Sequence, residues 1–242
     1  MSVLGFVSPA VSPTNLLYNV VALPGGIYRY MREGRMTWPL AGCVIAGTLP
    51  GVFFGALVRT SWLADPRYAK TFVGLLLLHL GWRLFTARLT ERRGVPAGAR
   101  VKTVAFTLAS VKYEFLGETY GFRPLSVFAL ALAVGVAGGI YGVGGGAIIA
   151  PFAVAVLGLP VYTIAGAAMC GTLVTSIAGV AFFEMLGTRA DWMLGLLFGI
   201  GGLAGTYAGA RVQRFLPERW IRLGLAALVT LIGVMYLTAL FR

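Results

Sequence analysis

A glycine run near the middle of the chain has residue types that suit anion binding. Residues 138–146 contain six glycines, and Gly142, Gly144, Gly145 and Gly146 precede an apolar segment that begins at Ala147. Backbone N–H groups at the start of a helix bind anions, and glycine lets a ligand approach the backbone closely. The run therefore predicts an anion site in unwound backbone, although close packing of helices would use the same glycines.

Amide and hydroxyl side chains form two further groups of candidate anion ligands. The first group is Ser12, Thr14, Asn15 and Asn19, and the second is Thr172, Thr175 and Ser176. Asn15 and Asn19 are four residues apart, so a helix would place them on one face. In apolar surroundings such side chains either bond a neighbouring helix or line a wet cavity. The hydroxyls of the second group could instead bond to their own helix.

Two titratable side chains lie within or beside apolar segments. His79 is the single histidine, and Glu184 directly follows the longest segment without charge. Either residue could relay a proton, because histidine titrates near neutral pH and carboxylates in membranes serve in proton relays. The alternatives are a hydrogen-bonded histidine in the helix packing and a glutamate at the level of the lipid headgroups.

Catalytic and metal-binding patterns are missing from the sequence. Cys43 and Cys170 both lie within apolar segments, and one histidine cannot supply a two-histidine zinc site. Neither a GxSxG elbow nor a Walker motif occurs. We therefore expect a protein that is not an enzyme and that uses no metal or cofactor.

The segments that carry these residues are apolar enough to span a membrane. The chain has 242 residues, of which 58% are hydrophobic and only 12% are charged, and its mean hydropathy is +0.85. A spanning helix needs about 20 mostly apolar residues, and residues 124–183 carry no formal charge at all. This composition excludes an ordinary soluble enzyme. It predicts an all-α fold, a polytopic helical bundle integral to the membrane.

The charge-free stretch is too long for one straight span. Residues 124–159 would extend about 54 Å at about 1.5 Å per residue, and the glycine run interrupts them. We predict a glycine-broken helix pair, at about 124–138 and 146–159, among about seven spans. Irregular backbone at membrane depth is tolerated only where it is buried or lines a wet cavity.

The sequence matches itself when it is shifted by 154 residues. Trp38 then falls on Trp192. The same shift superposes two glycine ladders, Gly47, Gly51 and Gly55 on Gly201, Gly205 and Gly209. Duplicated halves are typical of secondary transporters, which bind substrate where the halves meet. We predict a first repeat at 1–88 that lacks its first element, a basic connector at 89–123 and a second repeat at 124–242.

The glycine run resembles the signature of a known family. Residues 142–151 read Gly-Val-Gly-Gly-Gly-Ala-Ile-Ile-Ala-Pro, which is similar to the GxGGGxxxxP motif of the sulfite exporter TauE/SafE family, also called the 4-toluene sulfonate uptake permeases. The Leu-Gly-Leu-Pro turn at 157–160 and the short basic loop before Trp192 fit this family too. The resemblance implies a secondary transporter, acting as an exporter, for a small sulfur-containing anion such as sulfite or an organosulfonate. Alternating access at the interface of the two repeats would move the anion.

Two other functions stay open from the residues alone. A non-transporting membrane subunit or assembly partner of another complex would explain the first-repeat element that the sequence lacks. An anion channel would use the same polar residues without a carrier cycle. The glycine ladders could serve internal packing or the interface of a homo-oligomer.

Basic residues predict the orientation in the plasma membrane. If residues 124–159 cross once, thirteen Lys and Arg residues collect on one side against seven. If they form a hairpin, the division is fifteen against five, and the repeats are inverted. Both versions place the 29–35 loop and the 88–123 connector in the cytoplasm, but they disagree about the C-terminus. We expect a multi-pass protein whose partners are a small anionic substrate and the lipid bilayer, and not nucleic acid.

Overall fold

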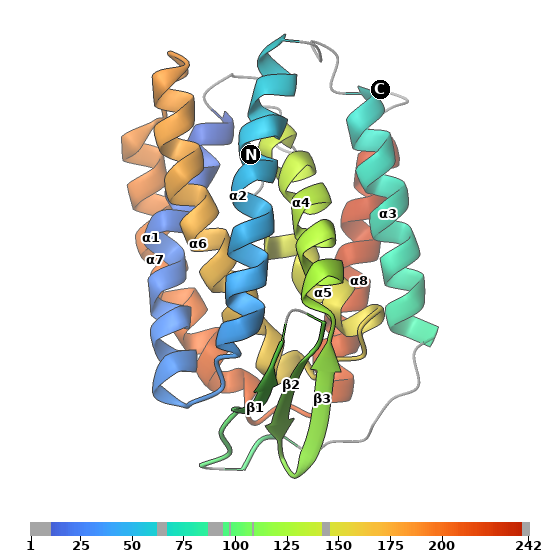
Figure 1. Cartoon of the computed structure of the whole chain (residues 1–242). Helices are drawn as coiled ribbons and strands as arrows, with labels where there is room; N and C mark the ends of the chain where they lie inside the picture. Colours follow the sequence, from blue (N-terminus) through green and yellow to red (C-terminus); the bar gives the residue numbers. More distant parts are fainter. Residues whose placement is uncertain are drawn as a thin grey trace.

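The computed structural model describes residues 11–61, 67–86, 94–96, 98–107, 109–141 and 146–238 of the chain. In these residues helices form a bundle, and a small sheet covers one end of it (Figure 1). The helices are α1 (Val11–Arg32), α2 (Trp38–Ser61), α3 (Arg67–Thr86), α4 (Pro124–Tyr141), α5 (Gly146–Ala155), α6 (Val161–Met185), α7 (Trp192–Gln213) and α8 (Glu218–Thr238). The strands are β1 (Lys102–Phe106), β2 (Val111–Phe115) and β3 (Glu118–Phe122).

The prediction of an all-α fold is wrong for the connector. Its residues 102–122 form an antiparallel sheet in the order β1-β2-β3. In β2, buried Val111, Tyr113 and Phe115 alternate with exposed charged residues, which is the two-residue period of a strand with one buried face. The loop Leu116–Gly117 has positive φ at both positions, as a two-residue hairpin of type I′ requires.

Helices α4 and α5 form a hairpin. Helix α4 begins directly after β3, and α6 begins at the same end of the bundle (Figure 1). There the hydroxyl oxygens of Tyr113 and Thr163 lie 2.9 Å apart. The sequence left open whether residues 124–159 cross the membrane once or form a hairpin. The structure has the hairpin, because the chain returns to the end of the bundle at which α4 begins. Helix α5 ends at Ala155, four residues earlier than predicted.

Helices in the two predicted halves occupy corresponding positions, 154 residues apart in the sequence. Adding 154 to the bounds of α1, α2 and α3 gives positions that overlap α6, α7 and α8, respectively. Each helix runs opposite to its counterpart (Figure 1). Helices α1 and α7 pack against each other, and so do their counterparts α6 and α2. These relationships are those of an inverted repeat, while the homology of the two halves stays a prediction.

Four of the described helices are long and apolar enough to cross a membrane. They are α2 over Trp38–Val58, α6, α7 and α8, and Pro124–Gly139 of α4 is a shorter apolar helix. Helices α7 and α8 leave most of their apolar side chains uncovered, as lipid contact would allow. The count of about seven spans stays a prediction.

The two glycine ladders have different surroundings. At Gly47 an added Cβ would lie 2.5 Å from the carbonyl oxygen of Phe128, because α2 and α4 pack closely there. The second ladder, Gly201, Gly205 and Gly209, would meet no described atom within 4 Å. The first ladder therefore serves packing inside the chain, and the second leaves one side of α7 open.

Candidate functional site

A groove whose lining is mostly apolar lies between α1, α6 and α7. It has a volume of about 410 Å³. Its polar side chains are Tyr18, Tyr30, Thr206 and Gln213, and its remaining lining consists of Ala165, Met169, Gly202, Gly205, Gly209 and Ala210. The groove exists because glycines replace side chains along this face of α7. We call it the α1–α6–α7 groove.

Hydrogen bonds join the walls of the groove across the two predicted repeats. Thr206 of α7 donates its hydroxyl to the carbonyl oxygen of Ala22 in α1 at 2.5 Å. At the end of the groove nearest the sheet, the Tyr30 hydroxyl donates to the side-chain oxygen of Gln213. Arg35 donates to the same oxygen from Nη1 at 3.1 Å. The groove thus runs from hydroxyl groups near its middle to a guanidinium at one end.

Asn19 and Ser176, one from each predicted group of ligands, meet where α1 packs against α6. The Asn19 amide donates from Nδ2 to Ser176 Oγ at 3.3 Å and links α1 to α6. Asn19 follows Tyr18, whose side chain lines the groove. Amide and hydroxyl groups in an apolar bundle can donate hydrogen bonds to an anion that enters between the helices.

Other members of the two groups have structural contacts. Ser12 and Thr14 are buried near the start of α1, and Thr14 Oγ1 accepts from the Asp191 backbone N–H at 2.8 Å. Asn15 is half-buried on the same helix. This hydrogen bond from the Asp191 backbone to Thr14 holds the start of α7 against α1.

Thr172 and Thr175 donate their hydroxyl protons within α6. Thr172 bonds to the carbonyl oxygen of Ala168, and Thr175 to that of Gly171, both at 2.8 Å. A hydroxyl that donates to its own helix has no second proton to offer an anion. A direct ligand role for these two threonines stays a prediction.

Most of the glycine run lies outside the described residues. This holds for Gly142, Gly144 and Gly145, whereas Gly146 is the first residue of α5. Gly138 and Gly139 belong to α4, which continues to Tyr141, three residues beyond its predicted end. The function of the run as an anion site stays a prediction.

The two proposed proton carriers lie in different places. His79 is exposed on α3, which does not line the α1–α6–α7 groove. Glu184 lies in the last turn of α6, where Oε1 accepts from the Ala190 backbone N–H at 3.1 Å. Proton coupling through either residue stays a prediction.

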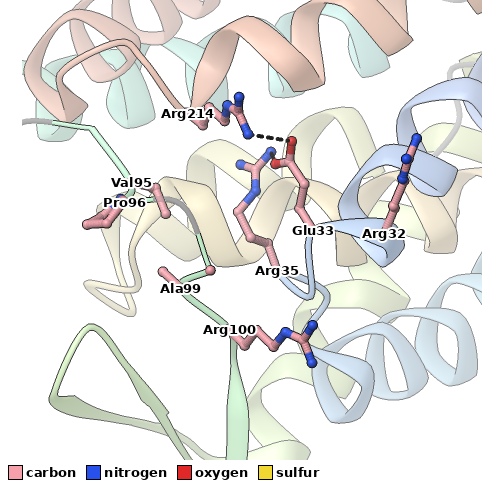
Figure 2. A pocket seen from close by; sticks show the side chains of 9 residues that line it. Arg32, Glu33, Arg35, Val95, Pro96, Ala99, Arg100 and Arg214 are labelled. Atoms are coloured by element: carbon pink, nitrogen blue, oxygen red, sulfur yellow. Dashed lines mark ion pairs between the residues drawn. The ribbon is translucent and has the colours of Figure 1, made fainter.

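Sequence reasoning missed an ionic cluster at the sheet end of the groove. Arg35 is only 1% exposed, and its Nη2 lies 2.5 Å from Glu33 Oε2 (Figure 2). Glu33 Oε1 lies 2.6 Å from Arg29 and 3.6 Å from Arg214. The four-residue spacing of Arg29 and Glu33 signals their helical pair. No local pattern signals the contact of Arg35 with Gln213, which is 178 residues away.

This arrangement favours anion binding over covalent chemistry. The groove supplies hydroxyl and amide groups, and the ionic cluster supplies positive charge at its end. Among the described residues, no group of three or more His, Cys, Asp and Glu side chains could hold a metal ion.

Comparison with known proteins identifies a family. A family model described as Sulfite exporter TauE/SafE matches residues 1–236. Searches of curated proteins and of solved structures gave no match.

Proposed function

Because the chain belongs to the sulfite exporter TauE/SafE family, a family of membrane transporters, we propose that it is a secondary transporter that exports a small sulfur-containing anion. The match over residues 1–236 carries this proposal, since it includes both predicted halves and the connector. Sulfite and small organosulfonates are the proposed substrates. No part of the proposed cycle requires a nucleophile or a metal.

The α1–α6–α7 groove is the proposed path of the anion. Tyr18, Thr206 and Gln213 line it, and the bonded pair Asn19 and Ser176 joins α1 to α6, two of the helices that form it. An oxyanion that leaves water needs hydrogen-bond donors in place of its hydration shell. The proposed glycine site at Gly142, Gly144, Gly145 and Gly146 would supply backbone donors in addition.

Alternating access is the proposed mechanism. Helix α1 of the first half packs on α7 of the second, and α6 packs on α2, so each half contacts the other along full helices. The hydrogen bonds from Asn19 to Ser176 and from Thr206 to Ala22 both cross between the halves. Movement of one half against the other would break these bonds and expose the groove to the opposite side.

The end of the bundle that carries the sheet is proposed to face the cytoplasm. The hairpin of α4 and α5 corresponds to the division of fifteen basic residues against five. The 29–35 loop and the connector belong to the more basic end. Short basic loops remain on the cytoplasmic side during insertion.

Flux measurements in liposomes test the proposal. The purified chain is reconstituted alone, and uptake of labelled sulfite, sulfate, thiosulfate and a small sulfonate is measured with and without a pH gradient. We expect saturable uptake that selects one of these anions, against none in empty liposomes. No uptake of any of them by folded protein would contradict the proposal. Uptake that never saturates would indicate a channel instead.

A further inference from the structure

A second, strongly basic pocket lies at the sheet end of the bundle, beyond the groove. It has a volume of about 200 Å³. Its charged lining residues are Arg32, Glu33, Arg35, Arg100 and Arg214 (Figure 2). Three segments that are distant in the sequence meet here, namely the end of α1 with its loop, the connector and the turn after α7. We call it the basic pocket.

Backbone hydrogen bonds build the walls of the basic pocket. The Val101 N–H donates to the Gly34 carbonyl at 2.9 Å, and the Val95 N–H donates to the Arg214 carbonyl at 2.8 Å. Gly34 has a φ of +67°, and a Cβ there would lie 2.8 Å from Cγ of Arg100. These contacts hold the connector, including Arg100, against the two helix ends, so the pocket is part of the fold.

The charges in the basic pocket do not balance. Its lining residues include four arginines but one carboxylate, that of Glu33, which pairs with Arg35, with Arg214 and with Arg29 outside the lining, while the exposed Arg32 and Arg100 lie apart from it (Figure 2). Arg35 is 1% exposed, and its Nε is buried without a hydrogen-bond acceptor in the described part of the chain. The buried Nε atoms of Arg29 and Arg214 also have no hydrogen-bond acceptor among the described residues. Arg29 and Arg35 are thus both largely buried around the single Glu33 carboxylate, and such an excess of buried positive charge is costly unless an anion compensates for it.

We propose that the basic pocket binds a small oxyanion. Guanidinium groups match oxyanions because their paired N–H donors fit two oxygens at once. A volume of about 200 Å³ is below the roughly 300–1,000 Å³ of typical small-molecule sites. It suits a sulfite, sulfate or phosphate group better than a nucleotide. The same chemistry would accept a free anion or the phosphate of an anionic lipid headgroup.

The pocket has a specific place in the proposed transport path, an assignment that rests on the proposed function. Arg35 lines the basic pocket and also bonds Gln213 in the wall of the α1–α6–α7 groove. The pocket therefore captures the substrate anion on the cytoplasmic side before it enters the groove. Opposite charge at such an entrance raises the local concentration of the anion.

Binding measurements with arginine variants test this site. Radiolabelled sulfate and sulfite are titrated into the whole chain in phosphatidylcholine nanodiscs. Arg32→Gln combined with Arg100→Gln removes two outer guanidiniums without touching buried Arg35. Arg219→Gln is the control, because Arg219 is exposed on the first turn of α8 at the same end but does not line the pocket. We expect saturable binding that is at least about tenfold weaker in the double variant and unchanged in the control.

The possible outcomes distinguish failure of the site, a different occupant and failure of the transport function. Absence of saturable binding, or equal binding in the double variant and the control, would overturn it. If binding in phosphatidylcholine is weaker in the double variant, but binding to the unmodified chain is lost in nanodiscs that contain phosphatidylglycerol, the occupant is a lipid headgroup and the free anion is overturned. Binding in the pocket without flux in liposomes would reject the transport function but leave the site. Flux that is equal in the double variant and the control, together with equal binding, would reject the site alone.

Discussion

Gly51 of α2 and Gly135 of α4 meet backbone to backbone. A Cβ added to Gly51 would lie 2.8 Å from the Cα of Gly135, and one added to Gly135 would lie 3.1 Å from the Cα of Gly51. No side chain can fit between these helices without separating them. Gly51 belongs to the first glycine ladder, whose repeat-related counterpart on α7 has no packed neighbour of this kind.

The difference between the two ladders predicts that the same substitution destabilises one ladder and leaves the other unaffected. Gly47→Ala would place a Cβ 2.5 Å from the Phe128 carbonyl oxygen and 2.7 Å from Cβ of Ala131. Overpacking of this kind costs about 1–3 kcal/mol or more. We expect a lower unfolding temperature in detergent and less monodisperse protein. Gly201→Ala, at the related position, has open space and should behave as wild type. Equal effects of the two variants would contradict this account.

The attachment of the sheet to the bundle can be tested at one hydroxyl. Tyr113→Phe removes the buried hydrogen bond between the Tyr113 hydroxyl and Thr163 Oγ1, which lie 2.9 Å apart. We expect a loss of about 1 kcal/mol in the free energy of unfolding. Tyr120→Phe is the control, because the Tyr120 hydroxyl donates to exposed Glu118 and should change stability by less than about 0.5 kcal/mol. The same loss in both variants would show that the bond to Thr163 does not anchor the sheet.

Local signals in the sequence mark the starts of three helices. Charge-free windows begin near Trp38 and at Trp192, where α2 and α7 begin, and Pro160 directly precedes α6. The sheet also has a local signal, the alternation of Val111, Tyr113 and Phe115 with charged residues. The high density of basic residues in the connector favoured an interpretation as a loop, which is why the strands were not predicted.

The candidate site was predictable only in part, because it depends on contacts between distant segments. The polar residue types at Asn19 and Ser176 indicated functional positions, and the structure brings these two together. The burial of Arg35 had no such signal, since it depends on Gln213 and the Ala210 carbonyl at the far end of α7. A cation in a short loop ordinarily indicates only membrane orientation.

The contact between Asn19 and Ser176 predicts coupled effects on transport. If this bond positions donors for the anion, Asn19→Ala and Ser176→Ala should each lower the initial flux by about tenfold, equivalent to about 1.4 kcal/mol. The double variant should lose little more than the stronger single variant. Thr230→Ala removes a buried hydroxyl between α8 and α3, outside the groove, and should leave flux unchanged. Losses that simply add would show that the two side chains act independently.

Filling the groove should block transport without unfolding the protein. A Cβ at Gly205 would meet no described atom within 4 Å, and Gly205 lines the α1–α6–α7 groove. Gly205→Leu should therefore fold normally while its side chain occupies the path, and flux should fall at least about tenfold. Gly201→Leu adds the same side chain one turn away on α7, at an equally open position that does not line the groove. Wild-type flux in Gly205→Leu would exclude the groove as the path.

Proton coupling, if the transport cycle has it, requires a titratable group close to the moving anion. Glu184 lies on α6, eight residues beyond Ser176, whereas His79 is exposed on α3, away from the groove. We expect His79→Gln to keep both the flux and its dependence on a pH gradient. Glu184→Gln should keep the fold, because an amide oxygen can still accept from the Ala190 N–H, but should weaken the dependence on the gradient. The measurement is initial flux with and without an imposed gradient. Loss of the gradient dependence in His79→Gln alone would move the coupling to the opposite side of the bundle and separate it from the anion path.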